Sequence, residues 1–404
     1  MQQILITGAN PYNDNKGVAA LCYSLVYIIN EILEKQKKTC RIAVYTHEFT
    51  ETNDCLNYGE KRIDIHNIFP TQWKGLASLC KAFSSKWRLF NLKEFFQSSL
   101  VLSVNAGDSF ADIYGDNIFN AINECNELSI FFKKPLVLLP QTYGPFNQGG
   151  KALSTAKKVI EKSELVLSRD EESANYVNLI TGKTIEELID LAFFLPFYDI
   201  KQSHDKINVG VNISSLLWHG GYTKNNQFGL SQSYEYTMKS IIGHLLKMEN
   251  VRVHLIAHVQ GDRYNVENDY TLAYDLWNKY RNDRLVIAPF FLNPVDAKSY
   301  ISSMDLFMGS RMHACIGAFS SGVPVIPLAY SRKFSGLFTH TLQYPHNIDL
   351  TESGLQNITS HIDQVLNNLD TVRNQIERTN NTIVRERKNR LYAHIDGLIK
   401  KYIK

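Results

Sequence analysis

The chain has 404 residues, which is enough for two domains of ordinary size. Its hydrophobic content of 44% and charged content of 21% are those of a globular protein and exclude a mainly disordered chain. The formal net charge of +3 is too small for the clustered basic surface of a nucleic-acid-binding protein.

The cysteines and the apolar segments predict a cytoplasmic protein. The six cysteines form no Cys-x-x-Cys pair, so we interpret them as reduced thiols. The first ten residues lack the basic segment and the long apolar segment of a signal peptide. No run of about 18 apolar residues predicts a transmembrane helix.

Strand patterns alternate with helical patterns in the first half of the chain. The strand patterns are apolar and lie at residues 2–8, 41–47, 99–110, 135–146 and 164–170. The helical patterns place apolar residues at i, i+3 and i+4, and lie at 17–36, 117–134, 152–163 and 171–181. Alternation on this scale is typical of a doubly wound parallel sheet.

A segment without periodicity, residues 193–206, then separates this half from a second alternating series. The second series has strand patterns at 207–214, 250–259, 284–289, 305–310 and 323–330, and helical patterns at 233–249, 268–281, 293–304 and 311–322. The predicted fold is therefore α/β, with two Rossmann-like doubly wound domains at 1–198 and 206–345.

The remaining residues, 346–404, are predicted to form a polar helical tail, and two-domain folds of this type lead us to expect it to return to the first domain. Its last part, residues 385–404, is basic and amphipathic. The favoured interpretation is the solvated face of a packed helix, and the alternative is peripheral contact with an anionic membrane.

Positive charge without nearby acid marks the segment 306–348, which contains no Asp or Glu. Ser310 is predicted to be the N-cap of a helix that begins at Arg311. The free amides of the first turn and the helix dipole would attract an anion there. Arg311 could add a fork of donors, and a histidine such as His313 ordinarily titrates near neutrality. Lys333 follows the next strand at the same edge of the sheet, so we interpret the group as an anion site.

Arg169 is a second candidate functional residue. It follows the strand pattern 164–170, and Asp170 with Glu171 and Glu172 begins the next helix. An N-cap and two first-turn acids explain these carboxylates without any function. They do not explain Arg169, because its charge opposes the dipole at a helix start.

At these residues the sequence resembles the polysaccharide pyruvyl transferase family. The segments that carry the resemblance are 309–337, 165–173, 140–146 and 10–28. The resemblance implies a GT-B-like fold with two domains facing a cleft. It also implies transfer of the pyruvyl group of phosphoenolpyruvate onto two hydroxyls of a sugar, with formation of a cyclic ketal and release of phosphate. The expected acceptor is a lipid-linked precursor of an exopolysaccharide or capsule, which would place the protein at the inner face of the membrane.

Residue roles follow by motif match. His313, Arg169 and Lys333 are the implied catalytic residues, and His313 is the candidate general acid. Donor binding is assigned to Ser310, Arg311, Arg169 and Lys333. Acceptor binding is assigned to polar residues in the loops after the strands of the first domain: Asn10, Asn13, Lys16, Asp108, Asp112 and Gln141. The general base stays open among Asp108, Asp112 and Asp170.

Two loops depart from the family pattern, and both lie on the expected acceptor side. The first carries Lys16-Gly17-Val18 where the family often has Gly followed by an acid. The second carries Ala106-Gly107 in place of a Gly-Gly pair. The acceptor sugar, the bridged hydroxyls and the oligomeric state are therefore not predicted.

Three other functions are compatible with parts of the sequence, and each is disfavoured by one feature. A nucleotide-sugar glycosyltransferase of GT-B type commonly needs a carboxylate on the helix 311–322, which has none. An inactive sugar- or phosphate-binding module would be expected to lack Arg169, His313 or Lys333. A metal enzyme would need more ligands than His258 and Asp262 supply. We therefore expect no metal or other cofactor, with phosphoenolpyruvate as a substrate.

Overall fold

The structure is a computed structural model that describes residues 2–46, 52–69, 95–113, 115–147, 150–202, 205–262 and 265–404. The chain divides into two compact units. Unit 1 comprises Met1–Tyr12, Leu21–Phe194 and Arg387–Lys404, and unit 2 comprises Asn13–Ala20 and Leu195–Glu386. Each unit is built on a parallel sheet, so the predicted α/β class with two such domains is confirmed.

Unit 1 is organised around a sheet with the strand order β3-β4-β2-β1-β5-β6-β7-β8. Its strands are β1 Gln3–Thr7, β2 Arg41–Tyr45, β3 Asn53–Tyr58, β4 Lys61–Ile68, β5 Ser98–Ser103, β6 Leu136–Gln141, β7 Leu165–Ser168 and β8 Glu186–Glu187. Its helices are α1 Lys16–Gln36, α4 Asp116–Phe131, α5 Gly150–Lys162, α6 Glu171–Thr181, the 3-10 turn Leu191–Phe194 and α15 Arg385–Tyr402. The strands pair in parallel except for the β3–β4 hairpin.

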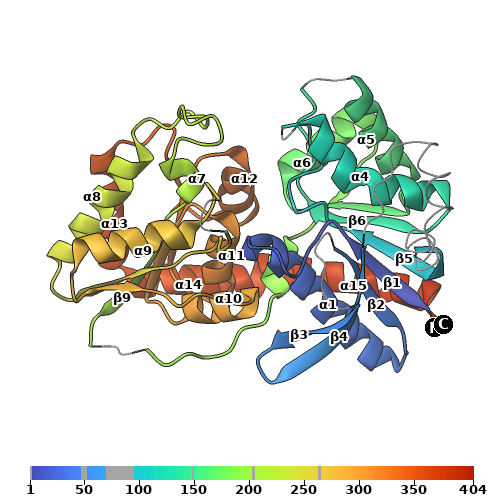
Figure 1. Cartoon of the computed structure of the whole chain (residues 1–404), viewed down its shortest axis with the longest axis horizontal. Coiled ribbons are helices and arrows are strands. Elements are labelled where there is room, and N and C mark those ends of the chain that lie inside the picture. Colours follow the sequence, from blue (N-terminus) through green and yellow to red (C-terminus); the bar gives the residue numbers. More distant parts are fainter. Residues whose placement is uncertain are drawn as a thin grey trace. The chain divides into compact units, whose positions relative to one another are not determined.

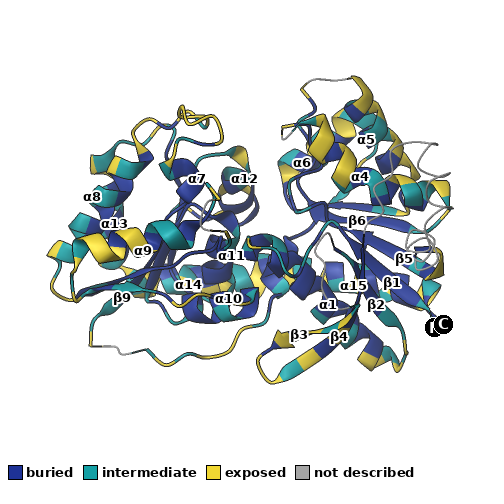
Figure 2. Cartoon of the chain, viewed as in Figure 1, coloured by how far each residue is buried: buried dark blue, intermediate teal, exposed yellow. Residues whose placement is uncertain are grey.

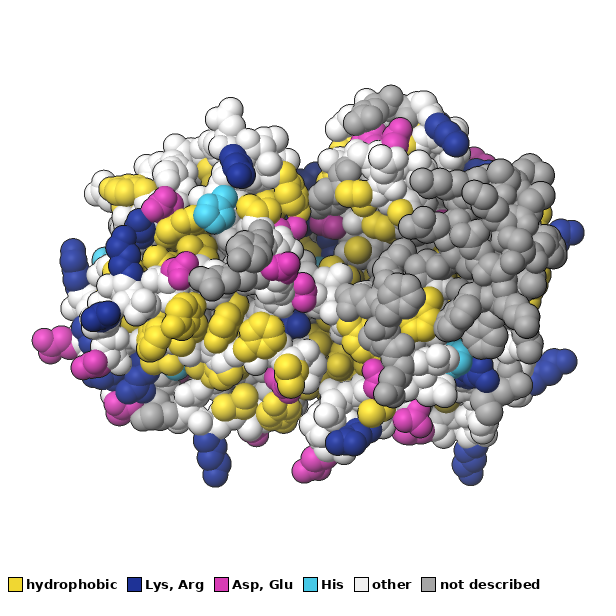
Figure 3. Space-filling model, viewed as in Figure 1, with side chains coloured by type: hydrophobic (Ala, Val, Ile, Leu, Met, Phe, Trp, Pro, Cys, Tyr) yellow, Lys and Arg dark blue, Asp and Glu magenta, His cyan; other side chains and the backbone are white. Residues whose placement is uncertain are grey.

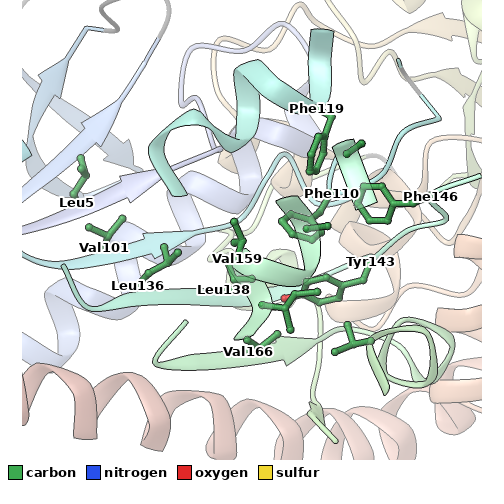
Figure 4. Close-up of a cluster of buried hydrophobic side chains, with 14 of the residues drawn as sticks. Leu5, Val101, Phe110, Phe119, Leu136, Leu138, Tyr143, Phe146, Val159 and Val166 are labelled. Carbon is green, nitrogen blue, oxygen red and sulfur yellow. The ribbon is translucent and has the colours of Figure 1, made fainter. Parts of the chain in front are cut away.

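Helices cover both faces of this sheet, as crossovers between parallel strands require. Figure 1 shows α4, α5 and α6 on one face and α1 with α15 on the other. The central strands β1, β5 and β6 are accordingly buried on both sides, as their dark blue colour in Figure 2 shows, whereas the edge strand β3 is largely exposed. An aromatic cluster under the β5 and β6 loops, drawn in Figure 4, contains Phe110, Phe119, Tyr143 and Phe146. Phe110 contacts the other three rings edge-on at centroid distances of 5.4–6.0 Å. This packing fixes the loops that carry the predicted acceptor residues.

Unit 2 has an all-parallel sheet with the order β11-β10-β9-β12-β13-β14. Its strands are β9 Ile207–Asn212, β10 Val251–Leu255, β11 Leu285–Ile287, β12 Leu306–Gly309, β13 Val325–Ala329 and β14 Ile348–Asp349. Its helices are α7 Ser215–Trp218, α8 Tyr234–Lys247, α9 Asp269–Tyr280, α10 Pro294–Ser302, α11 Met312–Ser320, α12 Arg332–Phe334, α13 Leu355–Leu366 and α14 Leu369–Thr379, with π-helical turns at Ser335–Thr341 and Asn380–Val384.

Helix α1 is more apolar than the sequence analysis allowed. Of the described helices, it is the one long and apolar enough to cross a membrane, and 72% of its most apolar window is buried inside the structure. Its apolar residues are those of a core helix. The first turn of α1 groups with unit 2 and the rest with unit 1.

The C-terminal tail, predicted as residues 346–404, divides between the two units. Residues up to Glu386 group with unit 2, and Arg387–Lys404 group with unit 1. Within unit 1, Arg387 forms an ion pair with Glu187, and Lys388 donates to the carbonyl of Phe193 (3.2 Å). The Gln36 side chain at the end of α1 donates to the Asp396 carboxylate (2.9 Å). The last helix therefore completes the first unit.

The cysteines that the structure describes carry free thiols: Cys22, Cys40, Cys55, Cys125 and Cys315. Burial raises the pKa of Cys22, Cys125 and Cys315, which are fully enclosed. Cys80 lies outside the described residues.

Candidate functional site

The helix that was predicted to bind an anion begins one residue later than expected. Its first residue is Met312 and its N-cap is Arg311, whose side chain makes no capping hydrogen bond. The prediction of Ser310 as the N-cap is therefore wrong. The buried Ser310 hydroxyl instead accepts a hydrogen bond from Tyr234 (3.0 Å), and the Arg311 amide donates to Asn212 Oδ1 (3.0 Å). His313 is the second residue of α11, which has no acidic residue in its first turn.

Arg311 is held by two carboxylates that lie more than forty positions earlier in the chain. Its Nε and Nη2 donate to Asp269 Oδ2 (3.1 Å) and Oδ1 (2.9 Å). Nη1 donates to Glu267 Oε2 (3.1 Å) and Nη2 to the Glu267 carbonyl (3.0 Å). Burial, the largest single influence, opposes the charge, but Asp269 together with Tyr330 and Glu267 outweighs it and raises the pKa of the guanidinium. Most of the Arg311 donors are thus already used, and donor binding by Arg311 stays a prediction.

Asp269 connects the carboxyl ends of three neighbouring strands of unit 2. Besides Arg311 after β12, it accepts from the amide of Ser215 after β9 (2.9 Å) and the amide of Val259 after β10 (3.1 Å). Its side chain is almost wholly buried. A buried carboxylate that accepts this many hydrogen bonds fixes the loops that approach it.

His313 lies against the first turn of α1. A Cβ atom built on Gly17 would be 2.5 Å from His313 Nδ1 and 2.8 Å from its Cβ, so glycine is needed for the approach. The Lys16 amide donates to the carbonyl of His258 (2.9 Å), and Asn15 forms an antiparallel bridge with Val259. Lys16, predicted as an acceptor residue of the first domain, is therefore buried in unit 2 beside the candidate anion site.

His258 follows β10 and is the second histidine of this cluster. It is buried, and its Nδ1 has no hydrogen-bond partner among the described residues. Burial, followed by the positive charges of His313, Arg311 and Lys16, holds its pKa well below the ordinary value. The buried surroundings of the His258 imidazole therefore disfavour its protonated form.

Lys333 lies over the ring of Tyr330 in unit 2. It lies on α12, directly after β13, with Nζ 5.7 Å from the centroid of the Tyr330 ring. The Tyr222 hydroxyl donates to Glu267, the partner of Arg311. Burial and this hydrogen bond raise the pKa of Tyr222, and Arg311 and Tyr330 also influence it electrostatically. Tyr330 thus contacts Lys333 and is close enough to Arg311 to influence it electrostatically.

Arg169 is enclosed within unit 1. Its Nη1 forms an ion pair with Asp190 (2.7 Å), which is itself buried, and its Nε donates to Thr142 Oγ1 (3.1 Å). Burial opposes the Arg169 charge, but Asp190, followed by Asp108 and Asp170, raises the pKa of the guanidinium. Asp170 is the predicted N-cap of α6, and its Oδ1 accepts from the Ser173 amide (2.7 Å).

Asp108 lies in a loop with an unusual backbone. The preceding residues Asn105, Ala106 and Gly107 have φ angles of +44°, +52° and +84°. Such left-handed angles favour glycine, and Ala106 stands where the resembling family carries one. A Cβ atom on Gly8 after β1 would lie 2.4 Å from the Asn105 amide nitrogen, so the two loops touch.

The other predicted acceptor residues mainly hold loops. Asp112 Oδ1 accepts from the Asn147 amide (3.1 Å), and Asn13 Oδ1 accepts from the Asn15 amide (2.8 Å). Asn10 Oδ1 accepts from the Tyr12 amide (3.0 Å) and from Thr46 (3.1 Å). Gln141 ends β6 and donates to the Tyr143 hydroxyl (3.2 Å), whereas its buried Oε1 accepts no hydrogen bond from the described residues. Acceptor binding by these side chains stays a prediction.

The predicted residues thus form two separate groups. Unit 2 brings together Ser310, Arg311, His313 and Lys16, and Lys333 lies over the ring of Tyr330 in the same unit. Unit 1 brings together Arg169, Asp108 and Gln141 at the carboxyl ends of its strands. Sequence reasoning missed Asp190, Glu267 and Asp269. The sequence signal that could have predicted these carboxylates is the pair of arginines at strand ends, because a buried arginine needs a carboxylate partner. Within the described ranges, no three His, Cys, Asp or Glu side chains group so as to hold a metal ion.

Comparisons with known proteins agree on family and fold. A profile of the family named Polysaccharide pyruvyl transferase matches residues 15–332. Solved structures that cover 99% of this chain include sucrose-phosphate synthase from Thermosynechococcus elongatus (12% identity, 99% of that chain, TM-score 0.59). Others with the same coverage are UDP-GlcNAc 2-epimerase from Neisseria meningitidis bound to UDP-GlcNAc (12% identity, 100% of that chain, TM-score 0.59) and Anabaena HepE in complex with UDP-glucose (13% identity, 99% of that chain, TM-score 0.54). At such identities the likeness confirms the GT-B-like fold alone. No curated protein sequence matches significantly.

Proposed function

Because the chain belongs to the polysaccharide pyruvyl transferase family, we propose that this transferase moves the pyruvyl group of phosphoenolpyruvate onto two hydroxyls of one sugar. Both hydroxyl oxygens bond to C2 of the pyruvyl unit, and the bond from C2 to the phosphate oxygen breaks. One hydroxyl proton equivalent ends on the methylene carbon, which becomes a methyl group, and the other ends on phosphate. The product is a cyclic ketal.

The observation that carries the proposal is the grouping of Lys16, His258 and His313 in unit 2, where the Lys16 amide donates to the carbonyl of His258 (2.9 Å) and His313 lies against Gly17. The phosphate and carboxylate of phosphoenolpyruvate are anions that this group could bind at the start of α11, where the helix dipole also favours negative charge. Lys16, His258 and His313 are therefore proposed to meet the donor in unit 2.

His313 is the proposed general acid. It lies at the start of α11, where the helix dipole attracts anions, and its ring is fixed by contact with Gly17. A bound phosphate and carboxylate would favour the imidazolium, because they are full charges at contact distance. The proton would then be present when the methylene carbon needs it.

Lys333 and Arg169 are the proposed donor-binding residues, as the motif match implies. Lys333 offers a point charge on a flexible stem, which suits phosphate. Arg311 is proposed to fix the start of α11 through its hydrogen bonds to Asp269. Ser310 is proposed to support the same turn through its hydrogen bond with Tyr234.

The general base is proposed to be Asp108. Asp170 caps α6, and Asp112 accepts from the backbone of Asn147. Asp108 is half-buried and close enough to Arg169 to influence it electrostatically. The acceptor is proposed to be a lipid-linked polysaccharide precursor at the inner face of the membrane, and the absence of metal-ligand spacing in the sequence leads us to propose catalysis without a metal.

The test incubates the protein with phosphoenolpyruvate and candidate glycans, and follows phosphate release together with a pyruvyl mass gain on the glycan. A parallel assay with excess chelator tests whether catalysis needs a metal, and full activity is expected. His313→Gln keeps a hydrogen-bond donor but delivers no proton, so turnover should fall about a hundredfold or more, with donor affinity within about tenfold. Transfer from a nucleotide sugar but not from phosphoenolpyruvate would refute the proposal.

A further inference from the structure

Helix α9 exposes a row of aromatic side chains that the proposed reaction does not use. Tyr270, Tyr274 and Trp277 are spaced by four and three residues, so they share one side of the helix. Tyr274 and Trp277 are 49% and 39% exposed, and their ring centroids are 5.9 Å apart. Large apolar side chains that are exposed together, rather than singly, indicate a binding surface.

A neighbouring segment extends the row. Phe290, which is 48% exposed, contacts Tyr270 in a T-shaped arrangement with a centroid distance of 5.4 Å. Leu292, 82% exposed, follows in the segment that leads to α10. Figure 3 shows hydrophobic side chains gathered on this face of unit 2, over α9 and that segment. We call Phe290, Tyr270, Tyr274 and Trp277 the aromatic row.

One end of the row adjoins the candidate anion site of the same unit. Helix α9 begins at Asp269, whose carboxylate holds Arg311 at the start of α11. Tyr270 is the next residue, and Trp277 lies about 10 Å further along the helix axis at 1.5 Å per residue. The row therefore leads away from the site along a line that could accommodate a linear chain.

We propose that the aromatic row binds the distal sugar rings of the acceptor glycan, an inference that rests on the proposed function. A pyranose ring has a face of C–H bonds that packs on an aromatic ring, while its hydroxyls need polar partners at the rim. Tyr270 and Tyr274 combine an apolar ring with a hydroxyl. Asp275 and Asn278, exposed on the adjoining side of α9, add acceptors and donors for sugar hydroxyls.

Other occupants fit this surface less well. Helix α9 exposes one acid, Asp275, and one base, Lys279, so it lacks the cluster of basic residues that binds an anionic membrane. A stable protein partner commonly covers about 800 Å² on each side, with charge depleted at the centre, whereas here charged and polar groups border the rings directly.

The test compares Trp277→Ala combined with Phe290→Ala against wild type. Tyr236→Ala on α8 is the matched control, because Tyr236 is a similarly exposed ring outside the row (58%). Pyruvyl transfer is measured with a disaccharide and with longer oligosaccharides of the same repeat. Removing two aromatic rings that would stack on sugar rings should lower kcat/KM for the longer acceptors about tenfold or more. The kcat/KM for the disaccharide, and all values for the Tyr236→Ala control, should stay unchanged. An equal loss at all lengths, or none, would overturn the proposal.

A second measurement separates this proposal from the proposed function. Binding to an array of hexose and N-acetylhexosamine oligosaccharides is recorded without phosphoenolpyruvate. Weaker binding of the row variant than of wild type supports the row even where no pyruvyl group is transferred. Binding that is identical in both overturns it. If glycan binding is unchanged but the row variant sediments differently from wild type, the row binds a second copy of the chain. If glycan binding is unchanged but the row variant no longer floats with anionic vesicles, the row binds a membrane.

Discussion

Single side chains at the ends of strands decide how each group of candidate residues is arranged. Arg311 and Arg169 were predicted from sequence as cations for a donor, and each is paired with a buried carboxylate, Asp269 and Asp190 respectively. Buried ion pairs of this kind are costly to break, because removal of one partner leaves the other charge buried alone. Both arginines therefore position loops whatever else they contact. His313 has a different constraint, since its ring is packed against the backbone of Gly17.

The first prediction concerns this packing. Gly17→Ala would place a methyl carbon 2.5 Å from His313 Nδ1, so the imidazole must move. If His313 is the general acid, pyruvyl transfer should fall at least about tenfold, because a small misplacement of a catalytic group costs this much or more. Gly243→Ala is the control, since nothing lies within 4 Å of a Cβ atom there, and a helical alanine should be neutral or stabilising. Full activity in the Gly17→Ala protein would contradict the assignment of His313.

The second prediction concerns the loop that carries Asp108. Ala106 has a φ of +52°, a region that costs an alanine about 1–2 kcal/mol. Ala106→Gly removes this cost but adds flexibility to the unfolded chain worth about 0.5–1 kcal/mol. The free energy of unfolding in urea should therefore stay constant or rise by up to about 1.5 kcal/mol. Gly107→Ala, at φ +84°, adds the strain and removes the flexibility, so it should leave the free energy constant or lower it by up to about 1.5 kcal/mol. Equal effects of the two changes would argue against the left-handed backbone.

At the scale of elements, the alternation of strands and helices could be predicted because buried parallel strands are short and apolar throughout. The β3–β4 hairpin was missed for the opposite reason. Its strands are half-exposed and rich in polar residues, with Asn53–Tyr58 joined to Lys61–Ile68 through a turn at Gly59. Topology also predicted which loops carry functional residues, since ligands bind beyond the carboxyl ends of parallel strands. It could not predict that Asp269 meets Arg311 across 42 residues of sequence.

The third prediction belongs to the element β10. His254 is buried between Tyr300, which hydrogen-bonds Nδ1 (2.9 Å), and Asn208, which hydrogen-bonds Nε2 (3.1 Å). Burial, and then the charge of Arg252, lowers its pKa to about 4. Below about pH 6.5, His254 therefore binds a proton in the unfolded chain, whereas in the folded protein it stays unprotonated until the pH approaches 4. The resulting stability is complete above that pH and should fall, by up to about 3 kcal/mol, as the pH drops towards 4.

His254→Gln isolates this contribution, because glutamine does not titrate. Urea unfolding between pH 7.5 and 4.5 should show a shallower loss of stability in the variant than in wild type, even if the variant is less stable at neutral pH. His258, His346 and His361 also have lowered pKa values, mainly through burial, and remain in both proteins. Parallel pH profiles for the two proteins would show that His254 is protonated when folded.

At the scale of the whole molecule, the chain visits its two units in an order that domain boundaries drawn from sequence did not describe. Asn13–Ala20 group with unit 2, and the chain then builds unit 1 up to Phe194, builds unit 2 up to Glu386, and returns to unit 1 for its last residues. A return of the tail was expected from two-domain folds of this type, but composition could not show where it begins, because the polar tail is uniformly helical. The information lies in the contacts of α15, whose Leu391, Ile395 and Ile399 are buried.

The last prediction tests this arrangement. Ile395→Ala in α15 and Ile376→Ala in α14 each remove a fully buried side chain, which typically costs 2–5 kcal/mol. Ile395 belongs to unit 1 and Ile376 to unit 2. Since about 1 kcal/mol shifts the Tm of a domain of 150–250 residues by 2–4 °C, each variant should lower one calorimetric transition by about 5–15 °C. Because each unit has its own core, the two variants should lower different transitions. If both lowered the same transition, α15 would belong with the second unit, and the return of the chain to the first would be wrong.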